Sequence, residues 1–170
     1  ISAVTGTAYT GETGSTSTSF TSGNAITESS TGGLTLAKLR NAKQILDSNS
    51  VDPSIPRAII VGPVAISDLL AVTQATSSDY ASVKALVNGE IDTFMGFNFV
   101  VSNRLSKTGN LRKLLVYAQD GMMLALGQDI VTRIDERSDK GYATQVYCAQ
   151  SVGATRMEEA KCVSIESYEA

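Results

Sequence analysis

The sequence changes character abruptly at residue 34, and this boundary most constrains how the chain can fold. Of the 28 residues from 6 to 33, twenty are Ser, Thr or Gly, and none is Lys or Arg. Gly resists a fixed conformation because ordering it costs backbone entropy, whereas Thr tolerates extended structure. Residues 1–33 therefore carry no pattern for a core of their own, and an extended arm, a hairpin and coil all remain open.

A helix is predicted immediately after this boundary, over about residues 35–49. Thr35 can cap its first turn, and apolar side chains then recur at spacings of three and four. These apolar positions are Leu36, Leu39, Ala42 and Leu46. The side chains predicted to face away from the core are Lys38, Lys43 and Asp47. The pattern is typical of an amphipathic helix with one face against a core.

The next segments predict a strand followed by two more helices. The branched apolar run at 57–63 predicts a strand that is buried on both faces. Pro63 then opens a helix that continues to about Thr73. A third helix is predicted over 78–89, where Gly89 is placed as its C-terminal stop.

After residue 90 the pattern changes to short strands. Segments 97–102 and 113–119 flank a polar turn and are expected to pair as a hairpin. The stretch 120–129 fits a short helical turn or a buried strand equally well. Further strands, separated by charged or Gly-rich breaks, are predicted over 130–135, 142–149 and 160–167. Helices early in the chain and an antiparallel-leaning sheet late in it predict an α+β fold.

The composition argues against most catalytic chemistry. The chain has no His, which removes Ser/His and Cys/His nucleophile pairs and imidazole metal sites. It also has no P-loop, nucleophile-elbow or calcium-loop motif. The acids Asp135, Glu136 and Asp139 are interpreted as a charged turn. We therefore predict no enzyme activity, no cofactor, no small-molecule substrate, and no catalytic, cofactor-binding or metal-binding residues.

Charge and hydropathy give no sign of a nucleic-acid or membrane surface. The formal net charge is −3, from 14 basic and 17 acidic residues, and the basic residues are scattered along the chain. No apolar run approaches the roughly 18–20 residues that span a bilayer. Sequence-specific nucleic-acid binding and membrane insertion are therefore not expected.

The two cysteines are predicted to be small buried hydrophobic residues. Cys148 and Cys162 each lie in an apolar, strand-like run. A disulfide between them stays open, although no framework spacing supports one. Assembly in a cytosolic compartment is the simpler expectation.

Several segments, taken in order, resemble a known family. The most specific are VNGEIDTFMGFNFVVSNRL, then KLLVYAQDGMMLAL, and finally GATRMEEAKCVSIE. This series resembles the major capsid protein of tailed bacteriophages, which has the fold named after phage Hong Kong 97. The resemblance covers about residues 34–167.

The resemblance implies an α+β Hong Kong 97-type fold with a spine helix, an axial-type domain and a peripheral-type domain. The implied division is 1–33 as a Ser/Thr/Gly-rich arm or loop, 34–56 as spine helix and link of the peripheral-type domain, 57–135 as axial-type domain, and 136–170 as return strands of the peripheral-type domain. In this family an arm and an extended loop precede the spine helix, so that region is expected to be missing or shortened here. Some members crosslink through a loop lysine. No Lys precedes Lys38, so that chemistry is not carried over.

The arm-like segment has an expected role in this scheme. Its few apolar side chains are predicted to pack on a neighbouring subunit or on the spine helix. They are Tyr9, Phe20 and Ile26. The Ser/Thr/Gly composition would then mark an intersubunit contact and not a linker between domains.

The implied function is structural. A chain of this family would be a subunit of a tailed-phage or prophage icosahedral capsid that self-assembles into pentamers and hexamers around double-stranded DNA. Its expected partners are copies of itself and DNA enclosed without sequence-specific binding, with portal, scaffold or cement proteins as further candidates. Its expected location is the virion shell, after assembly in the bacterial host cytoplasm. The alternative is a phage or bacterial surface adhesin with a Thr/Ser-rich stalk, although the helix-rich middle argues against a pure β adhesin.

Overall fold

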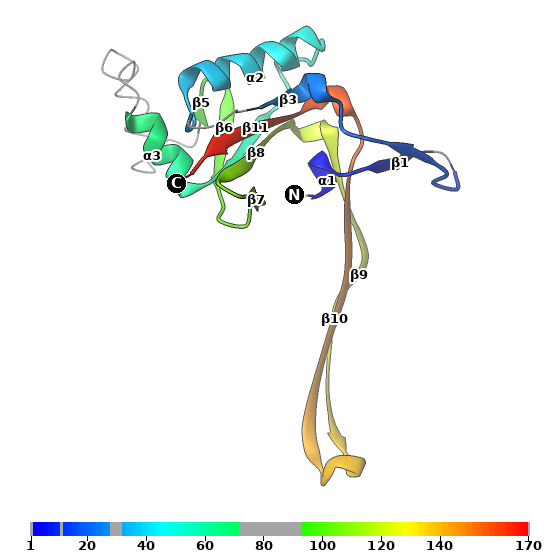
Figure 1. Ribbon diagram of the computed structural model, residues 1–170. Helices are drawn as coiled ribbons and strands as arrows, with labels where there is room; N and C mark the ends of the chain where they lie inside the picture. Colours follow the sequence, from blue (N-terminus) through cyan, green and yellow to red (C-terminus); the bar gives the residue numbers. More distant parts are fainter. Residues whose placement is uncertain (1, 11, 28–31, 72–92, 170) are drawn as a thin grey trace. The chain divides into compact units, whose positions relative to one another are not determined.

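The computed structural model describes residues 2–10, 12–27, 32–71 and 93–169 (Figure 1). The chain divides into two compact units. The first, here called the core unit, comprises Ile1–Met122 and Arg156–Ala170, and the second, here called the ribbon, is Met123–Thr155. The helix predicted over 78–89 lies outside the described residues.

Seven strands form a mixed sheet at the centre of the core unit, counted within the described residues. Their order is β3-β11-β8-β4-β6-β5, and β7 pairs with β8 outside this path. The β11–β3 and β4–β6 pairs are parallel, and the others are antiparallel. The strands are β3 (Ala25–Ile26), β4 (Arg57–Val61), β5 (Thr93–Phe94), β6 (Phe97–Val101), β7 (Lys107–Thr108), β8 (Leu111–Ala118) and β11 (Cys162–Tyr168). Four of the six strand pairs are antiparallel, so the sheet leans antiparallel as predicted, although it also takes in two parallel pairs and strands β3 and β4 from earlier in the chain.

Strand β4 separates the two strands that were expected to form a hairpin. Ile59 at the centre of β4 pairs with Phe99 of β6 on one side and with Val116 of β8 on the other. The predicted hairpin of 97–102 with 113–119 is therefore wrong, because an apolar strand from earlier in the chain takes the position between them. Along β4, alternate residues are fully buried while Ala58 and Ile60 are half-buried, so only one face is completely covered.

Helix α2 (Leu36–Ser48) confirms the helix predicted after residue 34. The Thr35 side-chain oxygen accepts a hydrogen bond from the Lys38 backbone N–H at 3.4 Å, which satisfies one of the free donors of the first turn. Leu39, Ala42 and Leu46 are fully buried, and α2 packs on β11. Figure 1 shows this helix lying along one face of the sheet.

The Lys38 side chain does not face away from the core, which corrects the sequence prediction. Its Nζ donates to the backbone oxygens of Gly32 at 2.8 Å, Gly33 at 2.9 Å and Glu166 at 3.0 Å. Buried backbone carbonyls need donors, and here one lysine supplies several of them. Lys38 therefore ties the first turn of α2 to the segment before it and to strand β11.

Helix α3 (Pro63–Ala71) starts at the proline, as predicted. Proline suits this position because the missing N–H has no partner inside the helix. Ala65 and Leu69 are buried and belong to the same hydrophobic core as the sheet. The core unit therefore joins α2, α3 and the sheet around one set of buried apolar side chains.

The N-terminal segment forms a hairpin and then joins the sheet. It contains a short helix α1 (Ser2–Thr5), the antiparallel pair β1 (Ala8–Thr10) and β2 (Thr16–Thr18), and a 3-10 turn η1 (Ser22–Asn24). Strand β3 follows, and Ala25 and Ile26 pair in parallel with Ser164 and Ile165 of β11. Of the alternatives left open by the sequence, the extended hairpin arm is the one observed.

The ribbon is a long two-stranded hairpin. Strand β9 (Met122–Arg137) and strand β10 (Ala143–Arg156) pair with each other and are joined by the 3-10 turn η4 (Ser138–Lys140). Gly141 and Tyr142 both have positive φ, at 64° and 60°, and the Tyr142 N–H donates to the Arg137 carbonyl at 3.0 Å. In the stretch 120–129, the first two residues end the 3-10 turn η3 (Gln119–Gly121) and the others belong to strand β9, which is mostly exposed. Neither of the two predicted alternatives, a short helical turn or a buried strand, therefore describes the whole stretch.

The C-terminal end of the ribbon differs from the prediction in a second way. Residues 152–159 were expected to break the strands, yet β10 continues to Arg156. The break follows as a 3-10 turn η5 (Glu159–Lys161) before β11 begins at Cys162. Strand pairing with β9 satisfies the backbone through the Gly- and Thr-containing stretch, which the local composition does not indicate.

Candidate interaction surfaces

The described residues contain no group of three or more His, Cys, Asp or Glu side chains placed to hold a metal ion. In the same part of the chain, no helix is long and apolar enough to cross a membrane. The expectation of no catalytic, cofactor-binding or metal-binding residues stays a prediction.

The three acids interpreted as a charged turn lie at the tip of the ribbon, where all are exposed. Arg137 forms an ion pair with Asp139 at 2.5 Å, with 44% and 57% of the two side chains exposed. The hydrogen bond from Arg137 holds the pKa of Asp139 below its ordinary value. Asp135 and Glu136 lie at the end of β9 and only Asp139 lies in η4, so the acids are solvated side chains around the turn.

The two cysteines have opposite environments, and both are free thiols. Cys162 is fully buried, and burial raises the pKa of its thiol to about 11. Its sulfur contacts the Gly121 carbonyl and the Met122 sulfur, each at 3.9 Å. Cys148 lies exposed on β10, so the prediction that both are buried is wrong for this residue. A two-stranded ribbon has no second layer to cover an apolar strand, which explains the difference.

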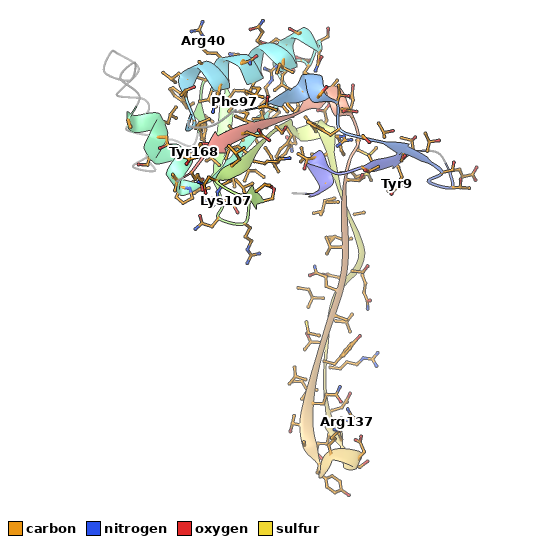
Figure 2. The ribbon with its side chains drawn as sticks, viewed as in Figure 1. Tyr9, Arg40, Phe97, Lys107, Arg137 and Tyr168 are labelled. Carbon is orange, nitrogen blue, oxygen red and sulfur yellow. The ribbon has the colours of Figure 1, made fainter. Side chains whose placement is uncertain are left out.

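The two faces of the ribbon, whose side chains are drawn in Figure 2, differ in their content of apolar residues. Neighbouring residues of a strand point to opposite faces, and Gly127 lies beside Ser151, so odd positions of β9 share a face with odd positions of β10. The even positions carry Leu124, Leu126, Ile130, Ile134, Val146 and Val152, each between 51% and 67% exposed. The odd positions include Asp129, Arg133, Asp135, Gln145 and Ser151. The division is not complete, since Met123 and Tyr147 lie at odd positions and Gln128 and Gln150 at even ones. We call the even side the apolar face and the odd side the polar face.

A shallow hollow on the ribbon supports this assignment, because residues that line one hollow lie on the same face. Five of its six lining residues are at odd positions: Val131, Arg133, Asp135, Gln145 and Tyr147. The sixth is Gln128. Charged and amide side chains therefore gather on the polar face. Sequence reasoning missed this two-sided pattern, although the period-two recurrence of apolar residues at 124, 126, 130 and 134 is a signal for it.

Within the core unit, Arg156 fixes the N-terminal segment. Its guanidinium donates to the Val4 carbonyl, to the Gly6 carbonyl at 3.1 Å and to the Thr18 carbonyl at 3.3 Å. The same group lies over the Phe20 ring, 5.3 Å from the ring centre, in a cation–π contact. One buried arginine at the end of β10 thus holds α1, the link between α1 and β1, strand β2 and Phe20.

The apolar residues of the N-terminal segment divide between core and solvent. Phe20 and Ile26 are partly buried against the core of their own chain. Tyr9 is 68% exposed on β1. Packing of Phe20 and Ile26 within the chain leaves Tyr9 as the member of the predicted set that is available to a neighbouring subunit.

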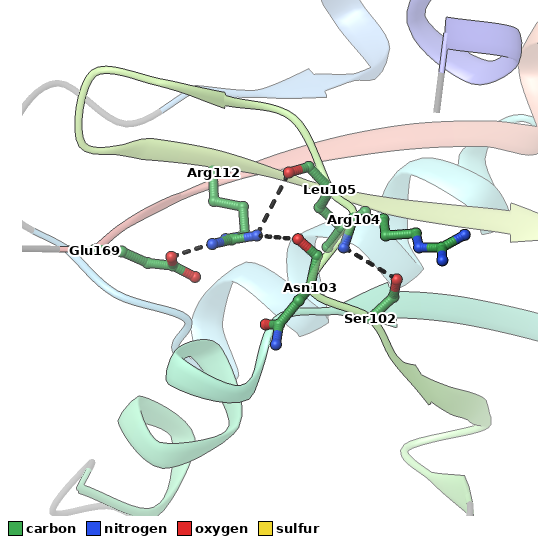
Figure 3. Close-up of polar contacts among 6 residues, drawn as sticks. All are labelled: Ser102, Asn103, Arg104, Leu105, Arg112 and Glu169. Atoms are coloured by element: carbon green, nitrogen blue, oxygen red, sulfur yellow. Dashed lines mark hydrogen bonds and ion pairs between the residues drawn. The ribbon is translucent and has the colours of Figure 1, made fainter.

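Arg112 of β8 and Glu169, the residue after β11, form a buried ion pair (Figure 3). The Arg112 Nε lies 2.7 Å from the Glu169 Oε2, and the two side chains are 14% and 2% exposed. The Arg112 Nη1 also donates to the carbonyls of Asn103 at 3.2 Å and Leu105 at 3.4 Å. A Cβ on Gly62 would lie only 3.0 Å from the other Glu169 oxygen, so glycine makes room for the pair.

Asp68 on α3 is predicted to destabilise the core unit when it is ionised. Burial, and secondly the charge of Glu169, raise the pKa of this carboxyl above its ordinary value of 3.8, against the opposing hydrogen bond from the Leu34 backbone and the charge of Lys38. A raised folded-state pKa means that the folded protein binds the proton more tightly than the unfolded chain. The destabilisation of the core unit by the ionised Asp68 carboxylate is therefore absent below pH 3.8 and complete above the raised pKa.

Asp68→Asn keeps an acceptor oxygen for Leu34 and removes the charge. The melting temperature of the variant is expected to exceed that of the wild type at pH 7, and the difference is expected to shrink as the pH falls towards 4. Thermal unfolding measured across this pH range tests the prediction. A difference that stays constant with pH would contradict it.

Comparison with known proteins places these features in a family. A family model described as phage capsid protein matches residues 1–169. A search of curated proteins finds no significant match to the sequence. Structural similarity is clear for a protein of Mycobacterium phage Che8, with a TM-score of 0.66 at 17% identity over 84% of this chain and 52% of that one.

Two further solved structures are similar over most of the chain. The capsid of Ralstonia phage GP4 has a TM-score of 0.65 at 11% identity, over 89% of this chain and 54% of that one. The Cyanophage Pam1 capsid asymmetric unit has a TM-score of 0.63 at 12% identity, over 99% and 63%. The chain therefore spans a little more than half the length of these proteins. Its mixed helix-and-sheet architecture is the α+β Hong Kong 97-type fold, and the chain belongs to the phage capsid protein family.

Proposed function

We propose that this chain is the shell-forming part of a major capsid protein, a structural subunit that catalyses no reaction. The observation that carries the proposal is the family match over residues 1–169, which leaves almost no part of the chain for a different function. The long ribbon with exposed apolar side chains adds support, since a subunit of a shell needs large contact surfaces. Nothing observed in the described residues favours the adhesin alternative.

The assembly that follows from this proposal is an icosahedral shell of pentamers and hexamers around double-stranded DNA. Closed symmetric shells repeat the same contacts many times, so individually weak interfaces sum to a stable particle. A net charge of −3 suits a protein that encloses DNA without binding its sequence. Portal, scaffold and cement proteins remain candidate partners, and assembly in the host cytoplasm is part of the same proposal.

The domain division that the family resemblance implies stays a prediction: residues 1–33 as arm or loop segment, 34–56 as spine helix and link, 57–135 as axial-type domain, and 136–170 as return strands of the peripheral-type domain. Its boundaries differ from those of the two compact units. Helix α2 shares one hydrophobic core with the sheet and α3, β9 and β10 form one hairpin, and β11 lies between β3 and β8.

Electron microscopy of the purified full-length capsid protein, expressed in bacteria, tests the proposed function. Closed shells, pentamers or hexamers are the expected products. A full-length protein that stays strictly monomeric and binds glycans would contradict the capsid function and favour the adhesin. Particles that form without DNA would still support a shell subunit, because enclosure requires no specific DNA contact.

A further inference from the structure

Residues 2–10 and 12–20, here called the strap, form a part of the core unit that does not join its sheet. Strands β1 and β2 pair with each other, and neither belongs to the seven-stranded sheet of the described residues. Among the strap side chains whose exposure the structure describes, Val4 is buried, Phe20 is half-buried, and most of the others are exposed. A two-stranded hairpin is marginally stable in water by itself, so the order of the strap depends on the contacts that hold it to the rest of the core unit.

Arg156 provides the polar contacts that gather the strap. Its side chain, in a residue that is 5% exposed, donates to the carbonyls of Val4, of Gly6 at 3.1 Å and of Thr18 at 3.3 Å. The guanidinium also lies 5.3 Å from the centre of the Phe20 ring. Hydrogen bonds from a charged donor are roughly twice as strong as bonds between neutral groups. A single side chain therefore holds both the beginning and the end of the strap.

The shape of the guanidinium suits this position as well as its charge. The group is planar and carries several N–H donors along its edge, so it can reach more than one carbonyl oxygen at once. Its face can stack on an aromatic ring at the same time. A lysine ammonium would keep the charge, but it is a point charge without a planar face. The contacts of Arg156 with the strap therefore depend on arginine in particular.

The chain that follows the strap is fixed by a different residue. The Thr21 backbone N–H donates to the Glu159 Oε1, and the Asn24 Nδ2 donates to the Glu159 carbonyl at 2.9 Å. Strand β3 then pairs with β11 in the sheet. Loss of the Arg156 contacts therefore leaves the segment from Thr21 to β3 attached, and the strap can separate at the boundary between residues 20 and 21.

We infer that the strap opens and closes as one unit, and that Arg156 is the residue that holds it closed. In the open state Val4 and Phe20 leave the hydrophobic core, while α2 and the seven-stranded sheet stay folded. Local opening occurs where a segment has few buried apolar side chains and an exposed backbone, and the strap has both properties. Opening turns a segment fixed on its own subunit into one that can reach other molecules. The inference concerns a single subunit and goes beyond the proposed function, so it holds whether or not the chain forms a shell.

Native-state hydrogen exchange of the unmodified protein tests whether the strap opens by itself. Exchange is measured by mass spectrometry in dissociated subunits, over urea concentrations below the unfolding midpoint. Strap opening exposes little surface, so exchange of the β1 and β2 amides is expected to depend weakly on urea. Exchange of the α2 amides is expected to rise steeply, because it requires unfolding of the core. An equally steep rise in the strap would show that it opens only with the core, and the inference would be wrong.

Two substitutions of Arg156 test the residue that holds the strap closed. Arg156→Met removes the charge-assisted hydrogen bonds, so it is expected to speed exchange of the strap amides at least tenfold and exchange in α2 and β11 less than twofold. Arg156→Lys keeps the charge without the planar group and is expected to have an intermediate effect. A variant Arg156→Met that does not fold, or that exchanges as fast in α2 as in the strap, would show that Arg156 supports the whole core. Wild-type exchange in Arg156→Lys would contradict the role of the guanidinium.

Chymotrypsin gives a second readout, because Phe20 ends the strap and its ring lies against Arg156. Cleavage after Phe20 is expected to be at least tenfold faster in Arg156→Met than in the wild type. Lys161→Met is the matched control: this nearby cation, 19% exposed, forms ion pairs with Asp120 at 2.5 Å and Glu158 at 2.7 Å, and neither partner belongs to the strap. It is expected to change strap exchange and cleavage less than twofold. An effect as large as that of Arg156→Met would overturn the assignment. All of these measurements use subunits, so their outcome is independent of shell formation.

Discussion

Arg112→Met is expected to lower the free energy of unfolding of the core unit by about 3–5 kcal/mol, the usual cost of leaving one member of a buried ion pair without its partner. The substitution leaves the Glu169 carboxylate, only 2% exposed, without its ion-pair partner, 2.7 Å away in the wild type. It also removes the donor to the carbonyls of Asn103 and Leu105. Chemical denaturation followed by circular dichroism measures the loss.

Arg137→Met is the matched control. Arg137 has an ion pair of similar length with Asp139, at 2.5 Å, but both side chains are about half exposed. Exposed pairs contribute about 0–1 kcal/mol, so this variant is expected to change stability little. Removing both buried charges with Arg112→Met and Glu169→Leu is expected to recover part of the loss. Equal effects of the two single arginine substitutions would show that burial does not set the strength of the Arg112 pair.

Leu39→Ala is expected to destabilise the core unit by about 2–5 kcal/mol, through lost apolar burial and the cavity that remains. Leu39 is fully buried on the face of α2 that packs on the sheet. Alanine has a higher helix propensity than leucine, so the loss cannot come from weakening the helix itself. The same denaturation measurement applies, since a folded but less stable protein is the expected product.

Leu124→Ala is the control for the core truncation. Leu124 is 65% exposed on the ribbon, so the same chemical change is expected to alter the stability of the isolated subunit by less than about 0.5 kcal/mol. A loss at Leu124 as large as the loss at Leu39 would mean that the apolar face is already covered within one chain. The pair of variants therefore tests the core of α2 and the exposure of the ribbon together.

Local sequence patterns predicted the elements whose formation depends on near neighbours. The Thr35 cap and the spacing of Leu39, Ala42 and Leu46 define α2, and Pro63 defines the start of α3. Capping and helical periodicity act within a few residues, so one sequence contains them completely. The charged turn at the ribbon tip was recognised for the same reason.

The features that the sequence did not predict depend on residues far apart in the chain. No local pattern indicates that β4 lies between β6 and β8, because that order depends on which pairing buries most apolar surface. Lys38 faces inward because the carbonyls of Gly32 and Glu166 are near it only in the folded state. Cys148 is exposed because its strand pairs in a ribbon without a covering layer.

The position of β11 has a consequence for how the protein is made. This strand lies between β3 and β8, so Ala25 and Ser164, which are far apart in the sequence, meet in adjacent strands. During synthesis β3 leaves the ribosome well before its partner strand does. Such distant pairing slows folding, because the chain entropy is lost before the contacts form. The complete sheet therefore forms only after residues 162–168 are synthesised.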